Sequence, residues 1–234
     1  MTWTELRHAH TPDGGRMVLR CRDGVYEIRV NGWELMSNRA HRSEEAMAEL
    51  ACAGRDGVRQ VLLGGLGMGY TLRAALDAVS AAARITVVEL LPEIVDWNRG
   101  PLAALAGRPL DDPRVDLRIG DVGEALAGAQ AAYDAILLDV DNGPRPVSDR
   151  GNQLLYGPAG RAAAQRALRP GGVLAVWSAD PAPEFEQLLA ASGFAARAVE
   201  VSPRGTPDGP MHTILLGTLP EGCRKDLIPT ARQD

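Results

Sequence analysis

The stretch that decides the fold is Arg59-Gln-Val-Leu-Leu-Gly-Gly-Leu-Gly-Met-Gly-Tyr-Thr-Leu72. An apolar run of strand length ends in glycines at every second position, Gly65, Gly67 and Gly69. Apolar residues at helical spacing follow at once, at positions 72, 75, 76 and 79. Because glycine has no Cβ, it lets the backbone turn sharply and approach a ligand closely. The stretch therefore predicts a strand, a tight turn and a helix, with a ligand at the turn.

The spacing of these glycines separates two kinds of nucleotide-binding site. A dinucleotide fold usually has G-x-G-x-x-G, which would require glycine in place of Tyr70. The tighter G-x-G-x-G is similar to the first motif of S-adenosylmethionine-dependent transferases. Glu89 ends the next apolar run, about 20 residues further on, where Rossmann-type folds place a carboxylate on ribose hydroxyls. We expect a nucleoside site at the glycines and Glu89, with a bare structural turn as the alternative.

The composition suits one α/β domain with a small addition. The chain has 234 residues, and its 45% of hydrophobic residues suffice for a full core. The net charge of -5 argues against a nucleic-acid-binding protein, which usually has a basic face. No apolar stretch approaches the roughly 20 residues that cross a bilayer, and the N-terminus lacks the pattern of a signal peptide. We expect a cytoplasmic protein with no membrane segment and no nucleic-acid partner.

The metal-ligating residue types are few and scattered. Cys21, Cys52 and Cys223 contain no C-x-x-C pair, and an odd number does not suggest a disulfide framework. Only four histidines are present. We therefore expect no metal site and cysteines without a chemical role.

The first part of the chain predicts short β segments. Residues 17–21 and 25–30 flank Arg22-Asp23-Gly24, which is a hairpin signal. Asn31-Gly32 offers a second turn before another segment at 33–36. We expect a small N-terminal β segment over 1–42, a Rossmann-like catalytic domain over 43–217 and a C-terminal tail over 218–234.

From residue 58 onward, strand and helix patterns alternate, which is typical of right-handed crossovers and a largely parallel sheet. The last connection, 202–210, is rich in proline and glycine and predicts an antiparallel pair at the sheet edge. The expected fold is thus the α/β, Rossmann-like fold of class I S-adenosylmethionine-dependent methyltransferases, with a seven-stranded, mostly parallel sheet. The expected strands are 59–64, 84–90, 114–119, 133–139, 172–178, 194–201 and 211–217, and the expected helices are 69–80, 91–99, 121–127, 158–168 and 182–192.

Acidic residues follow the third and fourth of these strands, where an open α/β sheet binds its ligands. Asp121 follows the third strand and is a candidate acceptor for the adenine amino group, although it is equally placed to cap the next helix. Asp139 and Asp141 follow the fourth strand, and Asp139 directly ends an apolar run. Burial and a like-charged neighbour both raise a carboxylate pKa, as a general base or cation-binding group requires. Asp139 and Asp141 are the predicted catalytic pair.

Together these segments resemble the spermidine synthase (polyamine aminopropyltransferase) family over approximately residues 17–200. The resemblance implies that Glu89 holds ribose, that Asp121 holds adenine and that Asp139 is the catalytic acid. It also implies that the N-terminal β region helps to build an oligomer, so we expect a homodimer. The motifs that carry it are Gly-Gly-Leu-Gly-Met-Gly-Tyr-Thr-Leu-Arg (64–73), Val-Val-Glu-Leu (87–90), Asp-Pro-Arg-Val (112–115), Gly-Asp (120–121) and Tyr-Asp-Ala-Ile-Leu-Leu-Asp (133–139).

The departures from that family concern the residues that would bind the amine substrate. Its aminopropyltransferases carry G-G-G-D-G-G, whose Asp faces the donor's amino group, and Met68 stands at that position here. Its D-S-S-D-P becomes residues 139–144, Asp-Val-Asp-Asn-Gly-Pro, and its Tyr-His-Glu segment becomes residues 42–45, Arg-Ser-Glu-Glu. The nucleoside-binding motifs are kept, which indicates a related enzyme that acts on another acceptor.

Four further residues are candidates for contact with the substrate, with packing or solvent exposure as the alternative for each. Glu45 belongs to a charged cluster at the start of a helix that should lie over the active-site mouth. Asn142 follows the predicted catalytic pair. Tyr156 lies where a lid over the site would follow the catalytic loop, and Trp177-Ser178 ends the fifth expected strand.

The sequence thus predicts an S-adenosylmethionine-dependent transferase that methylates a small-molecule acceptor, with an amine among the candidates. One alternative is a polyamine aminopropyltransferase that uses decarboxylated S-adenosylmethionine. Another is a non-catalytic binding protein that keeps the fold, against which the Asp139-Val-Asp141 sequence argues.

Overall fold

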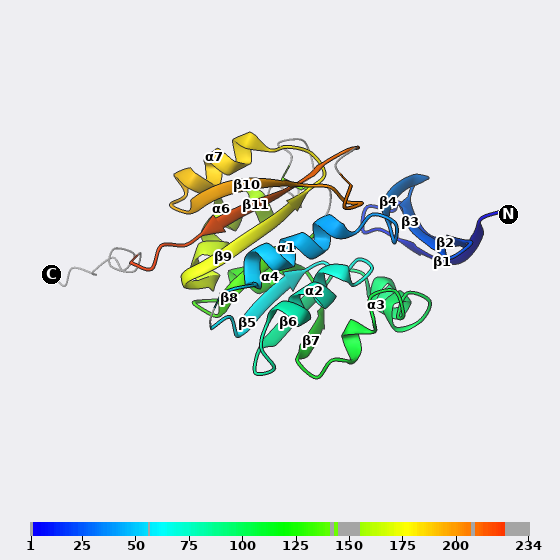
Figure 1. The fold of residues 1–234 in the computed structure, drawn as a ribbon, viewed down its shortest axis with the longest axis horizontal. Coiled ribbons are helices and arrows are strands. Elements are labelled where there is room, and N and C mark those ends of the chain that lie inside the picture. Colours follow the sequence, from blue (N-terminus) through cyan, green and yellow to red (C-terminus); the bar gives the residue numbers. More distant parts are fainter. Residues whose placement is uncertain (1, 56, 141–142, 145–154, 207–208, 223–234) are drawn as a thin grey trace.

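The computed structural model describes residues 2–55, 57–140, 143–144, 155–206 and 209–222, which contain two β-sheets. A small sheet of four strands lies beside one end of a larger, seven-stranded sheet (Figure 1). The predicted sites at Asp141 and Asn142, and most of the predicted tail over 218–234, lie outside the described residues. The division into domains stays a prediction.

The large sheet has the strand order β10-β11-β9-β8-β5-β6-β7. Six strands run in the same direction, and β11 alone runs antiparallel to them, between β9 and β10. The α/β prediction with seven mostly parallel strands and a terminal antiparallel pair is confirmed. The strands are β5 (Gln60–Gly64), β6 (Arg84–Glu89), β7 (Val115–Ile119), β8 (Tyr133–Leu138), β9 (Leu168–Ser178), β10 (Ala195–Val201) and β11 (His212–Thr218).

Helices cover both faces of this sheet (Figure 1). Side chains alternate between the faces along each strand, so Val61 and Leu63 belong to one buried cluster and Leu62 to the other. The first cluster packs under α1 (Arg42–Cys52), α2 (Tyr70–Ala78) and α3 (Pro92–Arg99). The second packs under α4 (Val122–Ala127), α6 (Pro158–Ala167) and α7 (Pro183–Ala191). The result is a three-layer α/β/α arrangement.

The small sheet is an antiparallel meander of β1 (Thr4–His10), β2 (Arg16–Arg22), β3 (Val25–Val30) and β4 (Trp33–Ser37). Both predicted turns are present. Asp23-Gly24 and Asn31-Gly32 each place two consecutive residues at positive φ, as tight hairpins favour. The sheet contributes the side chain of Met36, which a Cβ added to Gly67 would meet at 2.8 Å.

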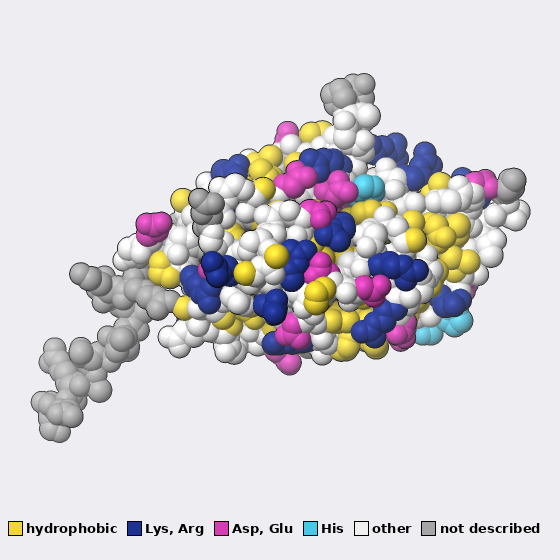
Figure 2. All heavy atoms as spheres, turned by 60° about the horizontal axis from the view of Figure 1, so that its bottom comes forward, with side chains coloured by type: hydrophobic (Ala, Val, Ile, Leu, Met, Phe, Trp, Pro, Cys, Tyr) yellow, Lys and Arg dark blue, Asp and Glu magenta, His cyan; other side chains and the backbone are white. Residues whose placement is uncertain are grey.

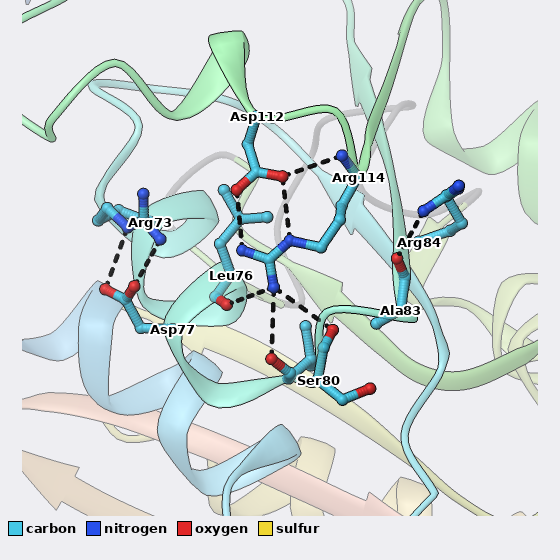
Figure 3. A network of polar contacts seen from close by, with 9 residues as sticks. Arg73, Leu76, Asp77, Ser80, Ala83, Arg84, Asp112 and Arg114 are labelled. Atoms are coloured by element: carbon cyan, nitrogen blue, oxygen red, sulfur yellow. Dashed lines mark hydrogen bonds and ion pairs between the residues drawn. The ribbon is translucent and has the colours of Figure 1, made fainter.

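An arginine fixes the end of α2, the helix that follows the glycines (Figure 3). The Arg114 guanidinium donates to the carbonyls of Leu76 at 2.9 Å and Val79 at 3.3 Å, which satisfies carbonyl groups at the helix C-terminus. It also pairs with the Asp112 carboxylate at 2.8 Å, and these bonds lower the pKa of Asp112 to about 2. The Asp-Pro-Arg-Val motif therefore anchors the C-terminus of α2.

The surface shown in Figure 2 carries arginine and acidic side chains that are interspersed rather than gathered by sign. Within the described ranges, no helix has the length and apolar character needed to cross a bilayer.

Candidate active site

The backbone between β5 and α2, residues 65–69, is called the glycine loop here. Gly65, Gly67 and Gly69 all have positive φ, at 86°, 52° and 87°. A Cβ on Gly65 would lie 2.2 Å from the carbonyl oxygen of Asp139, which no side chain tolerates. Only glycine fits this position, because the backbone has a positive φ and packs directly against the residue that follows β8.

Glu89 is the last residue of β6 and is 7% exposed. Its two carboxylate oxygens accept hydrogen bonds from the backbone N–H groups of Leu66 and Leu91, each at 2.8 Å. Burial raises the pKa of Glu89, and those N–H donors oppose the shift. The structure thus brings Glu89 against the glycine loop.

Asp121 follows β7 and caps α4, since its Oδ1 accepts from the N–H of Gly123 at 2.7 Å. The preceding residue, Gly120, donates its N–H to the carbonyl of Glu89 at 2.9 Å, which ties the turns after β6 and β7 together. The capping role foreseen for Asp121 is present, and its exposed carboxylate lies at the same sheet edge as Glu89. Contact with adenine stays a prediction.

Asp139 follows β8 and lines a small hollow between the glycine loop, α1, α2 and the end of the N-terminal sheet. Its Oδ2 accepts from the Thr71 hydroxyl at 2.5 Å. Burial raises the pKa of Asp139 to about 6; the Thr71 hydrogen bond opposes this, and the charge of Glu89 adds to it. The lining residues are Met36, Ser37, Glu44, Leu66, Gly67, Met68, Tyr70, Thr71 and Asp139.

The second acid of this hollow is Glu44, not the predicted Glu45. Glu44 is 8% exposed, and burial together with the charge of Asp139 raises its pKa to about 7. Glu45 is absent from the lining; it pairs with His41 at 2.9 Å and with Arg42 at 3.3 Å. His41 in turn stacks on the Tyr70 ring at 3.9 Å.

A helical pattern in the sequence distinguishes Glu44 from Glu45. Residues four apart share a helix face, so Glu44 lies in line with Ala48 and Cys52, whereas Glu45 lies in line with Glu49. Both Ala48 and Cys52 are buried in the core. The apolar face of α1 therefore carries Glu44 inward.

Two more of the predicted substrate contacts, Trp177 and Tyr156, are not among the residues that line the hollow. Trp177 is buried, and its indole Nε1 donates to the Ser43 hydroxyl at 3.1 Å. Tyr156 is buried against Phe185, and its hydroxyl donates to the carbonyl of Val140 at 3.4 Å, one residue beyond Asp139. Both side chains support residues next to the site.

Asn98 was not among the predicted site residues, yet it holds the glycine loop. Its buried side-chain amide donates to the carbonyls of Gly67 and Ile94, at 2.8 and 2.9 Å. The signal in the sequence is a polar residue on the apolar face of a short helix, four positions after Ile94.

A family model described as the spermine/spermidine synthase domain matches residues 40–193, which include the glycine loop, Glu44, Glu89 and Asp139. This chain belongs to the spermine/spermidine synthase family. The match begins just before α1, so the N-terminal sheet precedes the matched domain.

Two curated relatives are named for the transfer of different chemical groups, aminopropyl and methyl. A polyamine aminopropyltransferase of Mycobacterium tuberculosis is 33% identical over 179 residues, covering 75% of this chain and 33% of the relative. A putrescine N-methyltransferase of Nicotiana tabacum is 38% identical over 117 residues, covering 50% of this chain and 28% of the relative. The matched part is thus a third or less of the length of each relative.

Solved structures of the spermidine synthase family share the fold. A spermidine synthase in complex with the transition-state analogue AdoDATO has a TM-score of 0.76 at 18% identity, covering 93% of this chain and 74% of the other. A putative O-methyltransferase from Klebsiella pneumoniae has a TM-score of 0.56 at 20% identity, covering 77% and 81%. The predicted class I methyltransferase-like fold is confirmed by these similarities.

Proposed function

We propose that this chain binds S-adenosylmethionine against the glycine loop and Glu89 and transfers its methyl group to a small cationic amine. The donor's ribose hydroxyls would donate to the Glu89 carboxylate, and its adenine would lie near Asp121. The positive φ angles of the glycine loop support this proposal, because a backbone without Cβ atoms lets a nucleoside lie close. The names of the curated relatives supply the acceptor class.

The single observation that carries the amine acceptor is the pair of acids in one hollow. Glu44 and Asp139 both line it, and burial raises the pKa of each, so that ionising either carboxylate there is costly. A cationic amine would stabilise both carboxylates at once. Asp139 would then accept the proton that the amine must lose before its lone pair attacks the sulfonium carbon. Alignment of that lone pair with the methyl group would supply most of the rate gain.

Met68 favours the methyl group over the aminopropyl group. It lines the same hollow at 3% exposure, where related aminopropyltransferases carry an acid toward the donor's amino group. An uncharged thioether does not repel the carboxylate that distinguishes S-adenosylmethionine from its decarboxylated form. Aminopropyl transfer stays the second candidate, because the Mycobacterium tuberculosis relative is named for it.

We expect S-adenosylmethionine to bind at least as tightly as decarboxylated S-adenosylmethionine in calorimetric titrations. The Met68→Asp variant should shift the ratio of the two affinities toward the decarboxylated donor by about 10-fold or more, since a close charge discriminates strongly. Met68→Leu keeps an apolar side chain of similar volume and should retain the wild-type ratio. A wild-type protein that clearly prefers the decarboxylated donor would restore the aminopropyltransferase assignment.

Glu89→Ala should weaken binding of the donor or its thioether product by about 1–3 kcal/mol, the cost of leaving buried polar groups unpaired. Asp116→Ala is the matched control, because it removes an exposed carboxylate from the neighbouring strand β7. Calorimetry with S-adenosylhomocysteine measures both. Undiminished binding to a folded Glu89→Ala protein, or tight binding of NAD to the wild type, contradicts the nucleoside site.

A further inference from the structure

The Ser43 hydroxyl joins three elements behind the hollow. Ser43 lies in the first turn of α1 and is fully buried. Its Oγ lies 2.5 Å from Oε2 of Glu44 and 2.8 Å from Nδ1 of His212, and it accepts from Nε1 of Trp177 at 3.1 Å. Trp177 is the penultimate residue of β9 and His212 begins β11, with the two rings edge to face at 4.7 Å between centroids. A buried acid of the candidate site is thus connected to a histidine on another element.

The supply of protons restricts how this cluster is arranged. A serine hydroxyl has one proton and two acceptor positions, while the indole N–H only donates. One acceptor position of Ser43 is therefore used by Trp177, and only one is left for Glu44 or His212. If Glu44 is ionised, Ser43 donates to it, and His212 must donate from Nδ1–H. If Glu44 is protonated, it donates to Ser43, Ser43 donates to Nδ1, and His212 carries its proton on Nε2.

These two arrangements differ by one proton, which enters or leaves at Nε2 of His212. Starting from protonated Glu44, its proton moves to the Ser43 oxygen, the Ser43 proton moves to Nδ1, and the Nε2 proton passes to water. The products are an ionised Glu44, an intact serine hydroxyl and a neutral imidazole with its proton on Nδ1. Nε2 has no hydrogen-bond partner among the described residues, and His212 is only half-buried.

We propose that Ser43 and His212 form a relay through which Glu44 releases its proton to solvent when a cationic acceptor covers the hollow, and regains it when the product leaves. The proposal rests on the amine acceptor of the proposed function. Glu44 is 8% exposed and faces the hollow, so a bound acceptor covers its direct route to water. Ser43 and His212 provide a route on the opposite side of the carboxylate. Both are positioning residues, because they act on the substrate only through Glu44.

The surrounding charges suit this exchange. Glu44 faces Asp139 at the end of β8 and Glu45 on its own helix, and Tyr70 of α2 has a pKa raised by burial and by both glutamates. Burial raises the pKa of Glu44 to about 7, whereas burial lowers the pKa of His212 from its ordinary 6.5. As the pH falls, Glu44 therefore gains a proton while His212 is still a neutral imidazole.

Nitrogen NMR of the full chain with ¹⁵N-labelled histidine tests the relay without any turnover. The chain has four histidines, and a His212→Asn variant assigns the signal. In the wild type, neutral His212 should change from the Nδ1–H to the Nε2–H tautomer as the pH falls through about 7. This change should be lost in Glu44→Gln and in Ser43→Ala. It should persist in Glu45→Gln, the matched control, since Glu45 pairs with His41 and Arg42 instead.

Adding putrescine and S-adenosylhomocysteine at a pH just below that change should return His212 to the Nδ1–H tautomer. A single neutral tautomer across the whole range, or a change that survives in Glu44→Gln, overturns the relay. A pH-driven change that obeys the variants but ignores putrescine supports the relay and overturns the amine acceptor instead. The two failures are therefore distinguishable.

Discussion

Asp139→Asn is expected to lower turnover by about 10²-fold or more, the usual scale for losing a general base. The substitution keeps the size and shape of the side chain but removes its charge and its capacity to accept a proton. Binding of the donor should fall much less, because the ribose and adenine contacts are assigned to Glu89 and Asp121. Normal turnover combined with lost donor binding would make Asp139 a donor-binding residue.

The pH dependence of turnover should identify the same group. Burial raises the pKa of Asp139 to about 6, so activity should fall as the pH drops through that value and the carboxylate gains a proton. The Thr71 hydroxyl opposes the rise, since it donates to the ionised form. Thr71→Val should therefore move the loss of activity to higher pH, while Thr71→Ser should leave it in place. A profile that is identical in all three proteins would exclude Asp139 as the titrating group.

Gly65→Ala is expected to lower the free energy of unfolding by about 2–5 kcal/mol. Left-handed backbone costs an L-residue about 1–2 kcal/mol, and forcing extra volume into a packed site costs typically about 1–3 kcal/mol more. The added Cβ would lie 2.2 Å from the carbonyl oxygen of Asp139. This oxygen belongs to the backbone directly after the central strand β8, so it cannot move aside easily. Urea unfolding measures the loss.

Gly24→Ala is the matched control for that substitution. Gly24 has a similar positive φ of 78°, but a Cβ there would meet nothing within 4 Å. It should therefore cost only the backbone strain, about 1–2 kcal/mol. Equal losses in the two variants would mean that the glycine loop does not run against β8 as described.

The large sheet could be predicted from the sequence because its strands are short apolar runs with helical patterns between them. The expected strand at 59–64 is β5, and the expected helix at 69–80 is α2 with slightly narrower bounds. β9 begins at residue 168 rather than the expected 172, since Leu168 pairs with Tyr133 across a register shift that no local pattern reveals. β1 was missed because its sequence, Thr-Glu-Leu-Arg-His-Ala-His, is mostly exposed and lacks apolar alternation.

The site was predictable where a residue directly ends a strand. Glu89 is the last residue of β6 and Asp139 directly follows β8, and parallel strands bring their carboxyl ends to one edge. Glu44 comes from α1, which precedes the first strand of the large sheet in the chain, and only its helical register relates it to the hollow. The relay through Ser43 depends on the placement of β11 beside β9, which is a long-range pairing. Such contacts are set by the assembled sheet and leave little trace in local sequence.

Mass spectrometry of the reaction products tests the central claim most directly. The full chain is incubated with putrescine and either S-adenosylmethionine or decarboxylated S-adenosylmethionine, with Asp139→Asn run in parallel. We expect methylated amine and S-adenosylhomocysteine from the first donor, with a rate reduced by about 10²-fold or more in the variant. An aminopropylated product from the decarboxylated donor, or no transfer to the amine from either donor, would contradict the account.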